Sequence, residues 1–164
     1  MHSEEAWRQW RESGASAALW VGDEPALARA AAALEAAGVR VVGLTGALLA
    51  RFDDAPALAQ RELESPGRLA PASERGAVQT AVEAAFDRLV DELGDESVGV
   101  ADCELALARG LDLRRLATGR KVLFLIPGEQ RGQRARLFAA GAQRPGLPAP
   151  EWLERSWDLG HDPA

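Results

Sequence analysis

The sequence has few of the side chains on which enzymes most often depend. Its 164 residues include one cysteine, Cys103, no tyrosine, and two histidines, His2 and His161, which lie near the two ends. A single cysteine excludes an intrachain disulfide and a thiolate metal cluster. The positions of the histidines argue against a serine–histidine–aspartate triad and against a histidine zinc site. Acidic neighbours on both sides of Cys103 raise the pKa of a thiol and weaken it as a nucleophile, so we expect a buried structural cysteine.

A long apolar run is also missing. No segment approaches the ~20 apolar residues of a membrane-spanning helix. The first ten residues, MHSEEAWRQW, are acidic where a secretory signal peptide is basic and then apolar. We therefore expect a cytoplasmic protein with no membrane partner.

Positive charge is concentrated in one part of the chain. The net charge is −6, and residues 1–112 carry 20 acidic side chains against 10 arginines. Eight basic residues then fall between 113 and 144, against the single acid Glu129: Arg114, Arg115, Arg120, Lys121, Arg131, Arg134, Arg136 and Arg144. This basic stretch is the strongest functional signal in the composition, because such a cluster suits phosphates or an acidic protein surface. Arginines on an edge strand also prevent sheets from pairing, so a purely structural role is the alternative.

Short apolar runs alternate with helical patterns along the chain. Four runs have the composition of strands buried on both faces: 17–21, 39–44, 98–101 and 122–126. The clearest helix between them covers 73–94, where apolar residues recur every three or four positions. Strand–helix–strand units join parallel neighbours by a crossover. We predict an α/β fold over residues 1–144: a three-layer domain with a mostly parallel sheet of four or five strands, Rossmann-like or degenerate P-loop-like.

Two stretches have weaker patterns. Residues 53–72 contain three prolines and a glycine and predict a long loop. Residues 145–164 begin with three closely spaced prolines and predict a linker and a C-terminal tail, with a short helix over 151–159 that carries Trp152 and Trp157. Four of the five tryptophans lie near the ends, where they pack the end helices onto the domain or form a docking surface for a larger protein.

The segment from Lys121 to Phe138 is the most informative part of the chain. Pro127 and Gly128 follow the apolar run 122–126, so we expect them to end that strand and begin a short polar loop. Gly132 marks a second turn. Arginines then alternate with apolar residues over 134–137, as in an edge strand with one solvated face.

Acidic residues follow the expected strands at the edge where an open parallel sheet binds ligands. Asp23, Asp102 and Glu129 each follow a strand, so a small metal-dependent phosphatase or nuclease is one alternative function. The simpler interpretation is a helix cap, a strand-end residue and a loop residue, because no spacing brings three carboxylates to one point. A nucleotide site is not expected, because the turn GDEPALAR lacks the second glycine and the lysine of a phosphate-binding loop.

A second alternative is a DNA-binding accessory module that uses Arg131, Arg134 and Arg136. Phe124 and Phe138 are the only aromatic residues near these arginines, which argues against a platform for base stacking.

The segment PGEQRGQRARLF resembles a motif near the C-terminus of the BrxB family of bacteriophage-exclusion (BREX) defence systems. In that motif a buried strand runs into Pro-Gly, a short turn follows, and Arg-Leu-Phe comes next. The residues that match without a gap are Pro127, Gly128, Glu129, Gly132, Gln133, Arg136, Leu137 and Phe138. The order of elements over residues 17–140 is similar as well. The chain also resembles the BrxF-like proteins of the same systems, small P-loop domains of which it would be a degenerate example.

Both resemblances imply a non-catalytic scaffold or adaptor of a BREX-like antiphage complex, without a cofactor, that acts through protein–protein contacts. The partners they imply are a PglZ-type phosphatase-like protein, the PglX methyltransferase or the large ATPase, with nucleic acid contacted only within the complex. The expected partner-binding residues are Pro127, Gly128, Glu129, Arg131, Gly132, Gln133, Arg134, Arg136 and Phe138.

Overall fold

A computed structural model describes residues 3–52, 72–131, 134–137, 147–148 and 156–159 of the chain. The helices of this part are α1 (Ser3–Glu12), α2 (Glu24–Ala36), α3 (Leu44–Leu49), α5 (Ala72–Leu93), α6 (Glu104–Ala108) and the 3₁₀ helix η1 (Leu113–Ala117). The strands are β1 (Ala17–Gly22), β2 (Arg40–Gly43), β3 (Val98–Ala101), β4 (Val122–Arg131), β5 (Arg134–Leu137), β6 (Leu147–Pro148) and β7 (Ser156–Asp158). No helix within these ranges is both long enough and apolar enough to cross a membrane.

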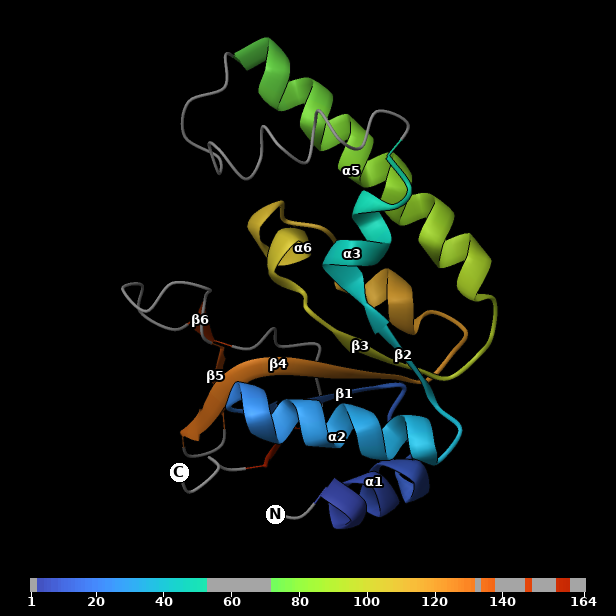
Figure 1. Ribbon diagram of the computed structural model, residues 1–164, viewed down its shortest axis with the longest axis vertical. Coiled ribbons are helices and arrows are strands. Elements are labelled where there is room, and N and C mark those ends of the chain that lie inside the picture. Colours follow the sequence, from blue (N-terminus) through green and yellow to red (C-terminus); the bar gives the residue numbers. More distant parts are fainter. Residues whose placement is uncertain (1–2, 53–71, 132–133, 138–146, 149–155, 160–164) are drawn as a thin grey trace.

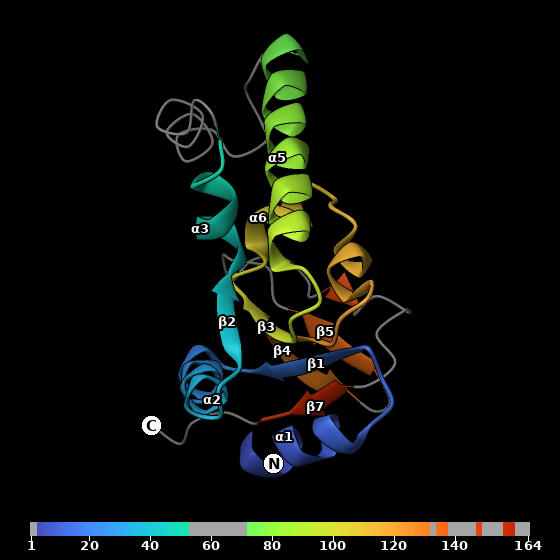
Figure 2. The ribbon, with the colours of Figure 1, turned by 90° about the vertical axis from the view of Figure 1, so that its right-hand side faces the viewer.

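The strands form one sheet in the order β2-β3-β4-β1-β7, with every neighbouring pair parallel (Figure 1). β5 pairs antiparallel with the second half of β4, and β6 pairs antiparallel with β5. Helices cover both faces of the sheet. Figure 2 shows α1 and α2 on one side, with α3, α5 and α6 on the other. The α/β fold with a mostly parallel sheet between two helical layers, predicted from the sequence, is confirmed.

Strand β4 lies in the middle of the sheet, and alternate residues of its first half pack into different helical layers. Phe124 and Ile126 contact the core under α3, α5 and α6, whereas Leu123 and Leu125 contact the core under α1 and α2. Each of these side chains is at most 3% exposed. Burial on both faces explains why the run from 122 to 126 contains no polar residue.

Helix α2 begins and ends where its sequence predicts. Asp23 caps its first turn, Pro25 follows in that turn, and Leu27 and Leu34 are buried against the sheet. Gly38 lies just beyond its end with a φ of +82°, a left-handed conformation that glycine adopts without a steric penalty.

Pro127 and Gly128 do not end the strand, so the prediction of a tight loop there is wrong. β4 continues through both residues to Arg131. The parallel ladder with β3 stops at Leu125 and that with β1 stops at Pro127, and pairing with β5 starts at Gly128. Proline lacks an N–H group, and it is tolerated here because the ladders change partner at this point.

The tail contains a strand where a helix was expected. Ser156–Asp158 form β7, which pairs with β1 in register, so that Trp157 lies beside Trp20. The rest of the expected helix, 151–155, lies outside the described residues. So does the expected loop 53–72 except for its last residue, Ala72, which begins α5. The division of the chain near residue 144 remains a prediction, although β7 adds three tail residues to the sheet of the main domain.

Candidate functional site

The carboxyl ends of β1, β2 and β3 lie at one edge of the parallel sheet, where β4 continues past its neighbours β1 and β3. Thr45 follows β2, and both its backbone N–H and its hydroxyl donate to the carbonyl oxygen of Asp102, at 3.0 and 2.8 Å. Asp102 follows β3 and has a φ of +56°, a strained conformation for a residue with a side chain. The two neighbouring strand ends are therefore joined by hydrogen bonds to one carbonyl group.

Asp23 occupies the N-terminus of α2. Its carboxylate oxygen Oδ1 accepts a hydrogen bond from the backbone N–H of Ala26, at 2.9 Å. Asp23 alone connects β1 to α2, so this turn has no loop of backbone amides that could surround a phosphate. A phosphate at this helix end would also have to displace the Asp23 carboxylate. The cap interpretation of Asp23 is confirmed.

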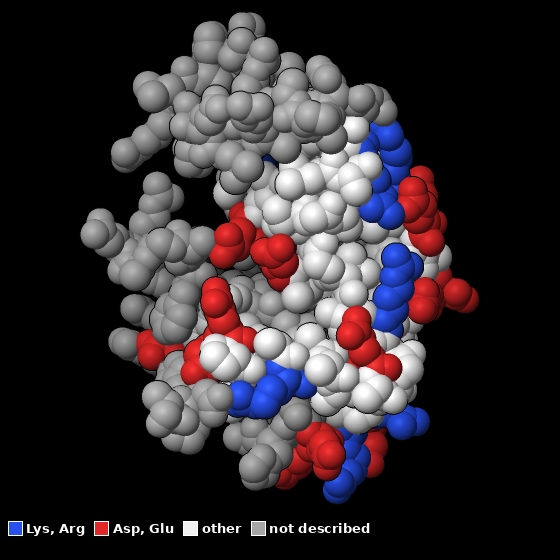
Figure 3. All heavy atoms as spheres, viewed as in Figure 1, with Lys and Arg blue, Asp and Glu red and all other residues white. Residues whose placement is uncertain are grey.

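Acidic side chains gather near this edge, over the middle of the face seen in Figure 3. Partial burial raises the pKa of Glu104 from its ordinary value, and the charges of Asp102 and Glu24 raise it further. Asp102 and Glu104 are exposed. Within the described ranges, however, no three histidine, cysteine or acidic residues are placed to hold a metal ion. The structure therefore adds no support to a metal site built from Asp23, Asp102 and Glu129.

Cys103 lies between these two acidic residues but points into the protein. The residue is 2% exposed and packs in the core under α3, α5 and α6. Burial raises the pKa of its thiol to about 12, and the neighbouring charge of Asp102 contributes to the increase. Cys103 is thus the buried structural cysteine expected from the sequence.

Two residues of the basic stretch hold distant helix ends. Arg120 donates to the carbonyl oxygens of Gly94, Leu116 and Val90, at 2.7, 2.9 and 3.1 Å. Lys121 donates to the carbonyl oxygen of Ser13, just beyond α1, at 2.7 Å. Both side chains donate to carbonyl groups at or just beyond a helix C-terminus, where the intrahelical hydrogen bonds stop.

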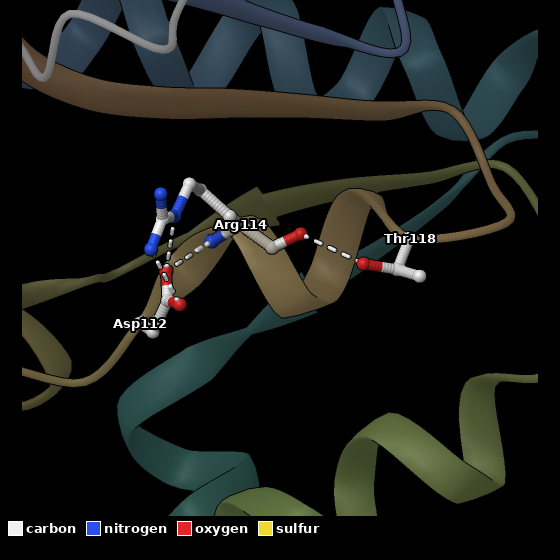
Figure 4. Close-up of polar contacts among 3 residues, drawn as sticks. All are labelled: Asp112, Arg114 and Thr118. Carbon is white, nitrogen blue, oxygen red and sulfur yellow. Dashed lines mark hydrogen bonds and ion pairs between the residues drawn. The ribbon is translucent and has the colours of Figure 1, made fainter.

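Two further residues of the stretch pair with nearby carboxylates. The Nε of Arg114 lies 2.8 Å from Oδ1 of Asp112, the residue that caps η1, and the pair holds the pKa of Asp112 below its ordinary value (Figure 4). Arg115 pairs with Asp87, and its guanidinium lies 5.4 Å from the ring centre of Phe86. Half of the eight basic residues, Arg114, Arg115, Arg120 and Lys121, therefore contact other groups of the protein itself.

Several of the predicted partner-binding residues lie on the hairpin formed by β4 and β5. Its pairs are Gly128 with Leu137, Glu129 with Arg136, Gln130 with Ala135, and Arg131 with Arg134. Gly128 is buried, Pro127 and Glu129 are partly buried, and Ala135 and Leu137 are at most 4% exposed. Gly132, Gln133 and Phe138 lie outside the described residues.

Tryptophans at the start of the chain pack onto the domain, as the simpler interpretation expected. Trp10 is 1% exposed, and its ring centre lies 5.2 Å from that of Trp7 on the next turn of α1. Trp20, on β1, is fully buried in the same cluster under α1 and α2. Trp10 and Trp20 therefore contribute to the hydrophobic core of the domain, which supports packing over a docking role for the tryptophans of this region.

The sequence interpretation missed the roles of Arg120 and Lys121, because their partners lie far away along the chain. It also missed the hydrogen bonds between Thr45 and Asp102, because no sequence motif signals them.

Comparison of the chain with protein-family models, with curated proteins and with solved structures finds no significant match.

Proposed function

We propose that this protein is a non-catalytic scaffold or adaptor of a BREX-like antiphage complex, and that it binds a larger protein through the β4–β5 hairpin. The motif that resembles the BrxB family supplies the biological context of this proposal. The partners considered are those that the resemblance implies: a PglZ-type phosphatase-like protein, the PglX methyltransferase and the large ATPase.

The observation that carries the proposal is the register of the hairpin. Residues alternate between the two faces of a strand, so paired positions share a face. One face holds Gly128, Ala135 and Leu137, all buried. Two further pairs, Glu129 with Arg136 and Arg131 with Arg134, alternate with these positions along the ladder. The register thus separates the buried positions of the motif from its charged positions, which pair with one another.

The remaining polar groups near the sheet edge support a binding role over a catalytic one. Asp23 is used as a helix cap, and the Cys103 thiol is buried with a raised pKa. The hairpin itself continues β4 beyond the ends of its neighbours β1 and β3 (Figure 1). An element of this kind, projecting from a rigid sheet, is well placed to contact another protein.

The proposal is tested by co-expression of the full chain with each of the three partner proteins, followed by affinity capture. The test variant replaces Arg134 and Arg136 by alanine. The matched control replaces Arg8 and Arg40, which are exposed on α1 and β2 and carry the same charge. Both variants are first checked for native circular dichroism and cooperative unfolding.

We expect the wild-type chain and the control variant to capture at least one partner, and the hairpin variant to lose most of that capture. Equal capture by the folded hairpin variant would remove this surface from the interface. Failure of the wild-type chain to capture any of the three would reject the assignment to a BREX-like complex.

A further inference from the structure

Helix α2 lies along one side of the molecule (Figures 1 and 2). Its inner side packs in the cluster that contains Trp10 and Trp20, through Leu27, Ala30 and Leu34. Its outer side is mostly apolar. The exposed residues of the helix are Glu24, Pro25, Ala28, Arg29, Ala32, Glu35 and Ala36.

The other two long helices present charged side chains to solvent instead. Between residues 4 and 12, the exposed residues of α1 are all charged: Glu4, Glu5, Arg8, Arg11 and Glu12. Between residues 81 and 93, the exposed residues of α5 are all charged as well: Glu83, Asp87, Arg88, Asp91 and Glu92. A helix on the surface of a soluble protein normally has a polar outer face. The apolar outer face of α2 therefore indicates that another protein surface covers it.

The few charges of this region are arranged symmetrically about Ala32, with opposite signs. Between residues 24 and 50 the chain has four charged residues, which alternate in sign: Glu24, Arg29, Glu35 and Arg40. Glu24 and Arg40 each lie eight positions from Ala32, and Arg29 and Glu35 each lie three positions from it. All four residues are exposed. A reversal of direction about Ala32 thus replaces each charge by the opposite one.

We propose that α2 pairs antiparallel with α2 of a second copy of the chain, about a two-fold axis beside Ala32. A two-fold interface joins the same surface of both copies, so the surface must be complementary to itself. In this arrangement Arg29 of one copy lies at the level of Glu35 of the other, within reach of these long side chains. Glu24, at the start of α2, likewise lies near Arg40, just beyond the far end of the other helix.

The packing surface of α2 suits such a pair. Ala28, Ala32 and Ala36 follow one another at intervals of four residues along the outer face, and their small side chains let two helices approach to about 8 Å. The antiparallel direction also places the positive N-terminal end of each helix beside the negative C-terminal end of the other. Alanine buries little apolar area, so we expect a dimer that dissociates on dilution.

The charge pattern favours a second copy over another protein. A parallel pair would bring Arg29 level with Arg29 and Glu35 level with Glu35, and like charges at such positions are destabilising. A helix of an unrelated protein would not require opposite charges at equal distances from Ala32. The inference goes beyond the function proposed above, because it uses no residue of the β4–β5 hairpin.

Disulfide trapping of the full chain tests the register. The background is Cys103→Ala, and a new cysteine is introduced by Ala32→Cys or, as the matched control, by Ala36→Cys. The two copies of residue 32 meet at the axis, within the Cα separation of about 7 Å that a disulfide tolerates. The two copies of residue 36 lie about 12 Å apart along the helices, because each is four residues from the axis.

Under mild oxidation we expect the Ala32→Cys variant to form the interchain disulfide at least about tenfold faster than the Ala36→Cys variant. Equal rates would indicate a parallel or random contact and would overturn the inference. So would the absence of an interchain disulfide in both variants.

Sedimentation velocity at low salt, over concentrations up to about 1 mM, tests the charges. Glu35→Arg opposes like charges and should weaken dimerisation at least about tenfold, because the two-fold axis repeats the effect. Adding Arg29→Glu to this variant restores opposite charges and should return the dissociation constant to within about threefold of the wild type. The control for net charge is Glu96→Arg, an exposed position beyond α5 that should have no effect.

A wild-type chain that stays monomeric at every concentration would overturn the inference. A double variant that associates no better than Glu35→Arg alone, with native circular dichroism in both, would do the same. Neither result bears on the capture experiment, which depends on Arg134 and Arg136 of the hairpin.

Discussion

The ammonium group of Lys121 lies 2.7 Å from the carbonyl oxygen of Ser13. The same group lies 5.7 Å from the ring centre of Trp10 and within 3.5 Å of the carbonyl oxygens of Trp10 and Arg11. A positive charge at a helix C-terminus is favourable, because the last carbonyl groups carry partial negative charge. Lys121 thereby fixes the end of α1 to the start of β4, although more than 100 residues separate the two along the chain.

Replacement of Lys121 by methionine should lower the free energy of unfolding by about 1.5 kcal/mol, because the charge-assisted hydrogen bonds are lost while most of the aliphatic stem is kept. Urea unfolding monitored by tryptophan fluorescence measures the change. The control is Lys121→Arg, which keeps the charge and should lose less stability. A methionine variant as stable as the wild type would show that the contact with Ser13 contributes nothing to the fold.

Arg120 should be more sensitive than Arg114 to substitution, although both belong to the basic stretch. Arg120→Lys should lower the free energy of unfolding by about 2 kcal/mol, because one ammonium group cannot reach the carbonyls of Gly94, Leu116 and Val90 together. Arg114 is exposed and pairs with Asp112 at the surface, so Arg114→Lys should leave the unfolding midpoint unchanged. Thermal unfolding of the two variants side by side provides the measurement. Equal loss of stability in both would contradict the assigned roles.

The parts of the fold that depend on local pattern could be predicted from the sequence. The apolar composition of 122–126 identified a doubly buried strand, and Asp23 followed by Pro25 identified the start of α2. The continuation of β4 through Pro127 could not be predicted in this way. In the local sequence, a Pro-Gly pair indicates a turn. The strand continues there because the ladder with β3 ends before Pro127 and a new ladder with β5 begins at Gly128.

The candidate site was predicted less completely than the fold, for a similar reason. The charge distribution identified the basic stretch. It could not distinguish the arginines that donate to carbonyl groups at helix ends from the arginines on the hairpin. The partners of Arg120 are backbone carbonyls, which leave no trace in the sequence. Strand β7 was likewise missed. It has three residues, too few for a recognisable pattern, and it is a strand because it pairs with β1.

Position 102, with its left-handed backbone conformation, should accept glycine with less loss of stability than a β-branched residue. Its φ of +56° is accessible to glycine without strain, is tolerated by aspartate, and is costly for valine. Asp102→Gly should leave the free energy of unfolding within about 0.5 kcal/mol of the wild type, because relief of strain offsets the greater flexibility of the unfolded chain. Asp102→Val should lower it by more than about 1 kcal/mol. Urea unfolding of both variants tests the prediction, and a valine variant as stable as the glycine variant would contradict it.

Cys103 should react with thiol reagents only after the protein unfolds. Its pKa of about 12 leaves a very small thiolate fraction near neutral pH, and burial blocks access to the sulfur. At pH 8 we expect alkylation of the native protein to be at least about a hundredfold slower than in denaturant. The native rate should keep rising with pH beyond the point where the rate in denaturant levels off, because the folded pKa is the higher of the two. Asp102→Asn is the matched control and should speed the native reaction slightly, since it removes the smaller cause of the raised pKa. Rapid labelling of the folded wild type at pH 8 would show that the thiol is accessible and ionised, and would reopen a chemical role for Cys103.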